Sequence, residues 1–143
     1  MIRIHGLSHL PPSARRPAAI AAVCRRALAL EKVRAGGELN VVVLDRRKMR
    51  RLNRRFLGRG QDTDVIAFDY PEDPGPIPGE RPFGDIFISA HLARAQAARL
   101  GHSVLSETLI LAAHGMLHIL GYDDSTGKAR ARMFRRQQAI AAL

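Results

Sequence analysis

The sequence predicts an α/β (α+β) fold, in which a small four-stranded mixed sheet packs with helices in one layered domain spanning residues 1–143. Three observations predict it. The chain of 143 residues has the usual size of one domain with one core. Short β-branched segments and longer segments of helical periodicity follow one another in the order βαβαββααα, which is typical of layered α/β domains. The chain contains no repeat and no linker long enough to divide it.

The N-terminal part begins with a short strand at residues 2–7. A helix follows from about Ser13 to Lys32, with Pro17 near its first turn. Residues 38–45, ELNVVVLD, are β-branched and apolar enough to form a buried strand.

Residues 46–57 predict a second helix, which Asp45 can cap. One stripe of this helix is apolar at helical spacing and is expected to pack against the rest of the protein: Met49, Leu52 and Phe56. The other faces carry six arginines: Arg46, Arg47, Arg50, Arg51, Arg54 and Arg55. We expect these arginines to form a cationic surface.

Residues 63–70 and 83–89 predict two further strands, and the prolines and glycines of residues 71–82 predict an irregular loop between them. Ser89 can cap the helix that follows at residues 90–101. Residues 105–121 predict an apolar helix, and residues 126–143 predict a basic C-terminal helix.

The charge indicates a polyanionic partner. The net charge is +10, and 20 of the 23 basic residues are arginine, whose planar guanidinium binds phosphate bidentately. A basic but inert surface, or a composition inherited from a GC-rich genome, is the alternative. With five phenylalanines and two tyrosines, extensive base stacking is not expected to set specificity.

The single cysteine, Cys24, lies among apolar residues and is interpreted as a small core residue. No disulfide within the chain can form, which fits a reducing compartment. The sequence contains no signal-peptide pattern and no apolar run of membrane-spanning length. We therefore expect a soluble cytoplasmic protein without a membrane partner.

The segment LILAAHGMLHILGYDD predicts a metal site. His114 and His118 are four residues apart and lie on one face of a helix, a spacing at which two imidazoles can bind one metal ion. Gly121 can end the helix, and a carboxylate from Asp123 or Asp124 can supply a third ligand and leave one position open for water. The alternative is two histidines bonded to backbone carbonyls or solvent.

A zinc peptidase is disfavoured by one residue. In the HExxH motif a glutamate follows the first histidine and acts as general base, and the corresponding residue here is Gly115.

HGMLHILGYDD resembles the HGxLHLxGYDH signature of the YbeY family of bacterial metal-dependent endoribonucleases, which act in ribosomal RNA maturation and ribosome quality control. GHS at 101–103 with Glu107, GDIFIS at 84–89, and residues 52–70 resemble further segments of the family in the same order. The resemblance extends from about Asn40 to Asp124. It implies a small α/β sandwich with zincin-like placement of the metal helix.

The resemblance implies that His114 and His118 are the first two metal ligands, and the third histidine of the family falls at Asp124. The expected cofactor is one divalent metal per chain, with Zn²⁺ as the expected ion. A carboxylate ligand adds negative charge and makes the metal a weaker Lewis acid. Asp123 is the competing third ligand, and its alternative interpretation is a turn or cap residue.

Many relatives carry an arginine directly after the aromatic residue that matches Phe56, and that arginine is thought to hold the scissile phosphate. This chain has Leu57 there. Arg59 can reach the same space from the loop between Gly58 and Gly60, and it is the candidate catalytic residue. The alternative is a solvated loop arginine.

Three acidic residues in the matching segments are candidates for orienting the metal ligands by hydrogen bonds without binding the metal themselves: Asp64, Asp85 and Glu107. Their alternative roles are, in that order, a loop-to-strand cap, a turn residue and an acid that favours the dipole of the metal helix.

The function implied is hydrolysis of phosphodiester bonds in single-stranded RNA, in 16S ribosomal RNA 3′ end maturation and ribosome quality control. The six arginines and the tail from Lys128 to Arg136 would hold the RNA backbone. The expected partners are ribosomal RNA and the small ribosomal subunit, with a ribosomal protein or a GTPase as a further candidate. Two alternatives stay open: a weakly active or non-catalytic RNA- or ribosome-binding module with a structural metal, and a zinc hydrolase of a small substrate.

Overall fold

The computed structural model of the chain describes residues 1–33, 37–70 and 84–142. The elements follow one another as β1 Ile2–His5, two short 3₁₀ turns Leu7–His9 and Pro12–Ala14, α1 Pro17–Leu30, β2 Leu39–Leu44, α2 Arg46–Leu57, β3 Val65–Asp69, β4 Gly84–Ser89, α3 Ala90–Leu100, α4 Val104–Ile119 and α5 Gly127–Ala141. The predicted order of strands and helices is confirmed. The predicted loop at residues 71–82 lies outside the described residues.

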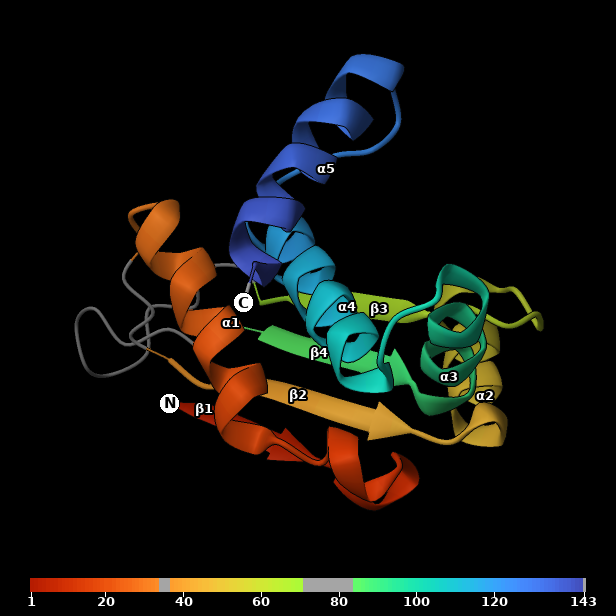
Figure 1. Cartoon of the computed structure of the whole chain (residues 1–143). Coiled ribbons are helices and arrows are strands. Elements are labelled where there is room, and N and C mark those ends of the chain that lie inside the picture. The colour runs from red at the N-terminus through yellow and green to blue at the C-terminus, as the bar shows by residue number, and fades with distance from the viewer. Residues whose placement is uncertain (34–36, 71–83, 143) are drawn as a thin grey trace.

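The four strands form one mixed sheet in the order β1-β2-β4-β3 (Figure 1). β1 pairs with β2 and β2 with β4 in parallel, whereas β3 is antiparallel to β4. The α/β (α+β) fold with a small four-stranded mixed sheet is therefore confirmed.

One face of the sheet forms the main core. Alternate residues of β2 and β4, such as Val41 and Ile86, are fully buried and pack in one cluster with apolar residues of α1, α4 and α5. Cys24 of α1 belongs to this cluster, as predicted, and burial raises the pKa of its thiol to about 12.

α2 lies against the opposite face. The ring of Phe56 packs edge-on against Phe68 of β3, and Phe68 packs in the same way against Phe87 of β4. Phe87 is adjacent to Ile86 and therefore points away from the main core. The sheet is thus placed between α2 on one side and α1 and α4 on the other.

One expectation about the helices is wrong, and another is confirmed only in part. The first helix begins at Pro17 and not near Ser13, because the residue before a proline is disfavoured in the α conformation, and Arg16 has φ −118° and ψ 78°. In α2, Met49 is buried but Phe56 is largely exposed. The buried polar residue is Asn53, whose amide donates a hydrogen bond to the carbonyl of Gln61.

The predicted caps are confirmed. The Asp45 carboxylate accepts a hydrogen bond from the N–H of Lys48 at 2.8 Å, and the Ser89 hydroxyl accepts one from the N–H of Leu92 at 3.1 Å. Among the described helices, none combines the length and the apolar composition needed to cross a bilayer.

Candidate metal centre and nucleic-acid surface

Two histidines meet near the C-terminal end of α4. The helix buries its apolar residues, and its partly exposed side carries His114 and His118. Their Nε2 atoms are 3.0 Å apart and their ring centroids 4.6 Å apart. The spacing of four residues therefore places both imidazoles together, as predicted.

Asp124 joins them through the turn that ends α4. Gly121 has φ 95°, a backbone conformation that residues with a side chain rarely adopt, and the chain reverses direction there. The carboxylate of Asp124 then lies 4.0 Å from His118 Nε2. One ligand atom from each of His114, His118 and Asp124 lies within 4.8 Å of the others.

Asp123 is occupied elsewhere. Its carboxylate oxygens accept hydrogen bonds from the N–H and the hydroxyl of Ser125, both at 2.7 Å. This is the geometry of a turn residue. Of the two candidates for a third ligand, the structure brings Asp124 to the histidines.

The protonation of the histidines suits a cation between them. His114 Nδ1 lies 2.8 Å from the side-chain oxygen of Gln137. Because that oxygen accepts, Nδ1–H can donate to it, and in this tautomer the Nε2 lone pair faces His118. Burial lowers the pKa of His118, a positive charge on His114 would lower it further, and the negative charge of Asp124 acts in the opposite direction.

The donor set fits a divalent metal. Ligands at about 2.0–2.2 Å from a tetrahedral ion are roughly 3.3–3.6 Å apart. The histidine Nε2 atoms are 3.0 Å apart, the Asp124 carboxylate is 4.0 Å from His118 Nε2, and all three ligand atoms lie within 4.8 Å of one another. The side chain of Asp124 is 50% exposed and that of His118 34%, so rotation of the carboxylate can close the gap and solvent can reach the ligands. Two imidazoles and one carboxylate leave one position open.

A cavity of about 520 Å³ adjoins the histidines and is lined by His114, Asp64 and Glu107, among others. Asp64 accepts hydrogen bonds from its neighbour Val65 N–H at 2.8 Å and from Gln96 at 3.2 Å. Two of the three acids predicted to orient the ligands, Asp64 and Glu107, thus line the same cavity as His114, but neither hydrogen-bonds to it.

Glu107 has a partner that sequence reasoning missed. It is 3% exposed, and its carboxylate lies 2.5 Å from Nε2 of His102. The predicted role in the helix dipole is compatible with its place in the first turn of α4. His102 precedes Ser103, the N-cap of α4, and therefore lies outside the helix that contains Glu107. Helical periodicity could not predict this pair.

Asp85 lies elsewhere. It follows Gly84 in β4 and alternates with Ile86, so its side chain points away from the face that α4 covers. There it accepts hydrogen bonds from Asn40, at 3.1 Å, and from the hydroxyl of Tyr70. The structure does not bring Asp85 to the three ligands.

Arg59 follows the end of α2. Its backbone N–H donates to the carbonyl of Asn53 at 3.4 Å, and its side chain is exposed. Within the described parts of the chain, no contact joins this side chain to the ligands. Its approach to a bound phosphate stays a prediction.

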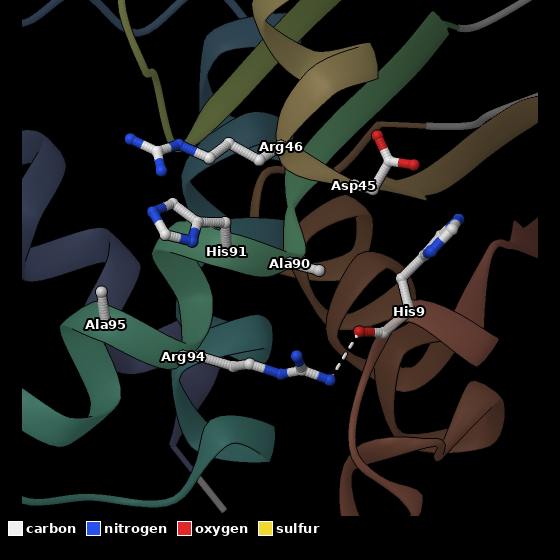
Figure 2. A pocket seen from close by; sticks show the side chains of 7 residues that line it. All are labelled: His9, Asp45, Arg46, Ala90, His91, Arg94 and Ala95. Carbon is white, nitrogen blue, oxygen red and sulfur yellow. Dashed lines mark hydrogen bonds between the residues drawn. The ribbon is translucent and has the colours of Figure 1, made fainter.

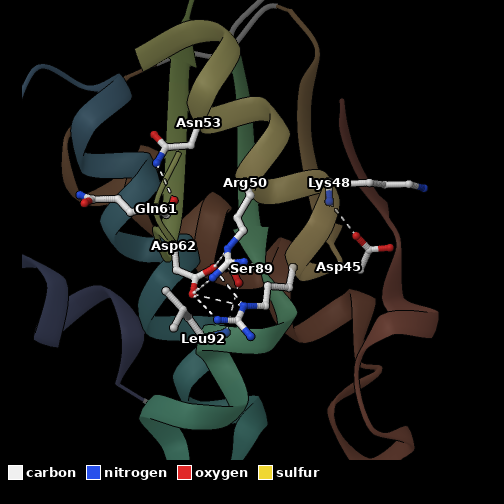
Figure 3. Close-up of polar contacts among 9 residues, drawn as sticks. Asp45, Lys48, Arg50, Asn53, Gln61, Asp62, Ser89 and Leu92 are labelled. Carbon is white, nitrogen blue, oxygen red and sulfur yellow. Dashed lines mark hydrogen bonds and ion pairs between the residues drawn. The ribbon is translucent and has the colours of Figure 1, made fainter. Parts of the chain in front are cut away.

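The six arginines of α2 are exposed, and five of them line one shallow surface cavity: Arg46, Arg47, Arg50, Arg51 and Arg54. Arg46 and Arg50 also converge on Asp62, at 2.9 and 2.8 Å. Figure 3 shows the contact between Arg50 and Asp62. Hydrogen bonds from Arg46 and then Arg50 hold the pKa of Asp62 down at about 2. Asp62 was not among the predicted site residues, and it neutralises part of the positive charge of the α2 surface.

A second cationic cavity, of about 460 Å³, lies where α2 and α3 begin. His9, Arg46, His91 and Arg94 line it together with Asp45, and Arg94 donates to the carbonyl of His9 at 2.8 Å (Figure 2). His9 and His91 are far apart in the sequence, so no motif indicated that they share a cavity.

Comparisons with known proteins assign the chain to a family and support its fold. Residues 12–143 match the family described as Endoribonuclease YbeY. Proteins named Endoribonuclease YbeY are 39% identical over 122 residues in Geobacillus kaustophilus (81% of this chain, 78% of the relative) and 39% over 129 residues in Moorella thermoacetica (84% and 81%). The solution structure of TM1509 from Thermotoga maritima is similar over 99% of this chain and 87% of that one, with a TM-score of 0.63 at 22% identity, which supports the fold.

Proposed function

The chain belongs to the YbeY family of endoribonucleases, and from that premise we propose that it is a metal-dependent hydrolase of phosphodiester bonds in single-stranded RNA. Its proposed substrate is ribosomal RNA of the small subunit, in 16S 3′ end maturation and ribosome quality control. One observation carries the proposal: His114, His118 and Asp124 converge at a partly exposed end of α4.

The three side chains would hold one divalent metal, with Zn²⁺ as the proposed ion. Bound there, the metal supplies Lewis acidity toward a phosphoryl oxygen and toward water. Gln137 would hold the His114 ring in the tautomer whose Nε2 is available as a ligand, and burial favours the neutral form of His118.

Arginines would offset the charge of the RNA. Arg59 is proposed to contact the scissile phosphate, because it is the first arginine after the position where many relatives carry one. The arginines of α2 and the basic residues of α5 would hold neighbouring phosphates, with an affinity that falls as salt rises.

The test is cleavage of RNA with a matched histidine control. The purified chain is incubated with Zn²⁺ or Mn²⁺ and with single-stranded and double-stranded fragments of small-subunit ribosomal RNA. His114→Ala and His118→Ala are each expected to lower the cleavage rate at least about 100-fold. His5→Ala, which removes an exposed histidine of β1, is expected to leave it unchanged.

Metal binding together with RNA binding, but without metal-dependent cleavage, would replace the nuclease with an RNA-binding module. Unchanged RNA affinity after neutralisation of Arg50, Arg51, Arg54 and Arg55 would contradict the assignment of α2 and favour a hydrolase of a small substrate.

A further inference from the structure

The cavity of about 520 Å³ beside His114 differs in chemistry from the arginine surface. α4 lies between α3 and α5 (Figure 1), and residues of all three helices line the cavity together with Asp64. Its volume is in the range of small-molecule sites, about 300–1,000 Å³.

The cavity does not favour a phosphate. None of the described residues that line it is an arginine or a lysine, although the chain carries a net charge of +10. Two of them, Asp64 and Glu107, are carboxylates that would repel an anion. The lining therefore disfavours an anionic group and suits a neutral or cationic group with hydrogen-bond donors.

The polar wall is held by hydrogen bonds within the protein. Glu107 is buried against the imidazole of His102, and the Asp64 carboxylate holds the amide of Gln96 at 3.2 Å. The side chains of His102, Asp64 and Gln96 are partly exposed and line the cavity. Because these hydrogen bonds lie within the protein, they orient the three side chains without a ligand. Carboxylate and amide groups are among those that pair with the edges of nucleobases, and an imidazole can donate or accept a hydrogen bond beside them.

The apolar wall carries two exposed side chains. Phe134 of α5 is 57% exposed and Leu100, the last residue of α3, is 58% exposed, and both line this cavity. One exposed apolar residue needs no explanation, but an exposed ring and a leucine beside a polar wall offer a surface on which a flat ring can stack.

We propose that this cavity receives one nucleobase of the RNA substrate. The base stacks on Phe134, with its edge toward Asp64, Gln96 and His102. The carboxylate of Asp64 can accept a hydrogen bond from an exocyclic amino group, so it favours a base that carries one over uracil. This inference rests on the proposed function, because His114 both lines the cavity and is a proposed metal ligand.

The test measures binding of the full chain to a fluorescent single-stranded RNA by anisotropy. Phe134→Ala is expected to raise Kd about 10-fold, Phe134→Tyr to retain affinity, and Leu30→Ala, another exposed residue, to have no effect. The slope of log Kd against log salt stays unchanged in Phe134→Ala, because the residue contacts no phosphate.

Abasic RNA then locates the base. One nucleotide at a time is replaced by an abasic residue, and each RNA is measured with the parent chain and with Phe134→Ala. At one position, the loss of affinity caused by the abasic nucleotide and the loss caused by Phe134→Ala are expected not to add, since both changes remove the same stacking contact. Full additivity at every position, or a reduced salt slope in Phe134→Ala, would overturn the inference.

This readout is independent of cleavage. Non-additive binding without cleavage would leave the base cavity standing and reject the nuclease. Cleavage that depends on His114, with additive losses at every abasic position, would retain the nuclease and reject the cavity.

Discussion

Asp123 and Asp124 are adjacent carboxylates that the fold uses differently. Asp123 closes a turn by accepting two hydrogen bonds from Ser125, whereas Asp124 lies beside His118. The difference is one of direction, because consecutive residues in a turn point their side chains to different sides.

This separation predicts the effect of two matched substitutions. Asp124→Asn is expected to lower Zn²⁺ affinity at least about 10-fold, because it removes a charged oxygen ligand, whereas Asp123→Asn changes it little. Asp124→His, which restores the usual pattern of the family, is expected to raise it. Competition with a zinc-sensitive dye measures all three. Equal losses in both Asn variants would show that Asp124 is not a specific ligand.

At the scale of elements, the packing of α4 on the sheet explains the absence of a glutamate after His114. A Cβ at Gly115 would lie 2.7 Å from Cγ2 of Ile86, a fully buried residue of β4. A side chain there would enter the core and not the metal centre. Position 115 is therefore a site of close helix–sheet approach, where general-base chemistry has no room.

Among the described residues, Asp62 is the acid that pairs with Arg46 and Arg50 of α2. The depressed pKa of Asp62 means that its ion pairs contribute stability above about pH 4 and lose it as the pH falls toward 2. Asp62→Asn is therefore expected to lower the urea midpoint at pH 7, and the difference from the parent should shrink between pH 4 and pH 2. A double Arg46→Gln, Arg50→Gln variant should reproduce this profile. A difference that is constant down to pH 2 would contradict the pairing.

Asp62→Asn should also change the affinity for RNA. Asp62→Asn releases Arg46 and Arg50 from their carboxylate partner, so RNA binding is expected to tighten at low salt and to weaken more steeply as salt rises.

At the scale of the whole molecule, α1 holds α5 over the site. The guanidinium of Arg26 donates to the carbonyls of Ile140 and Ala142, at 2.6 and 2.5 Å. α5 in turn carries Gln137, which orients His114, and Phe134. The metal centre and the adjoining cavity therefore depend on a contact made by a helix that contributes no ligand.

Arg26→Ala is expected to destabilise the chain by about 1–3 kcal/mol, because two hydrogen bonds to a charged donor are lost. Hydrogen exchange of α5 should accelerate more than that of the sheet. Arg25→Ala, which removes an exposed neighbour on the same helix, is the control. Equal protection of α5 in both variants would show that this tether does not hold the helix.

The sequence by itself determined the order of strands and helices, the caps at Asp45 and Ser89, and the meeting of His114 with His118. Each depends on residues a few positions apart, and the geometry of one helix or strand relates such residues directly. Asp124 belongs to this group in part, because the turn at Gly121 brings it back toward the helix.

Only the tertiary structure decided which side chains of different elements share a cavity. Asp64 and Phe134 meet beside His114, His9 faces the cavity that His91 lines, and Asp62 binds two arginines of α2. It also placed Asp85 on the far face of the sheet and exposed Phe56. These contacts arise from packing between elements, and the periodicity of a single segment carries no information about its distant neighbours.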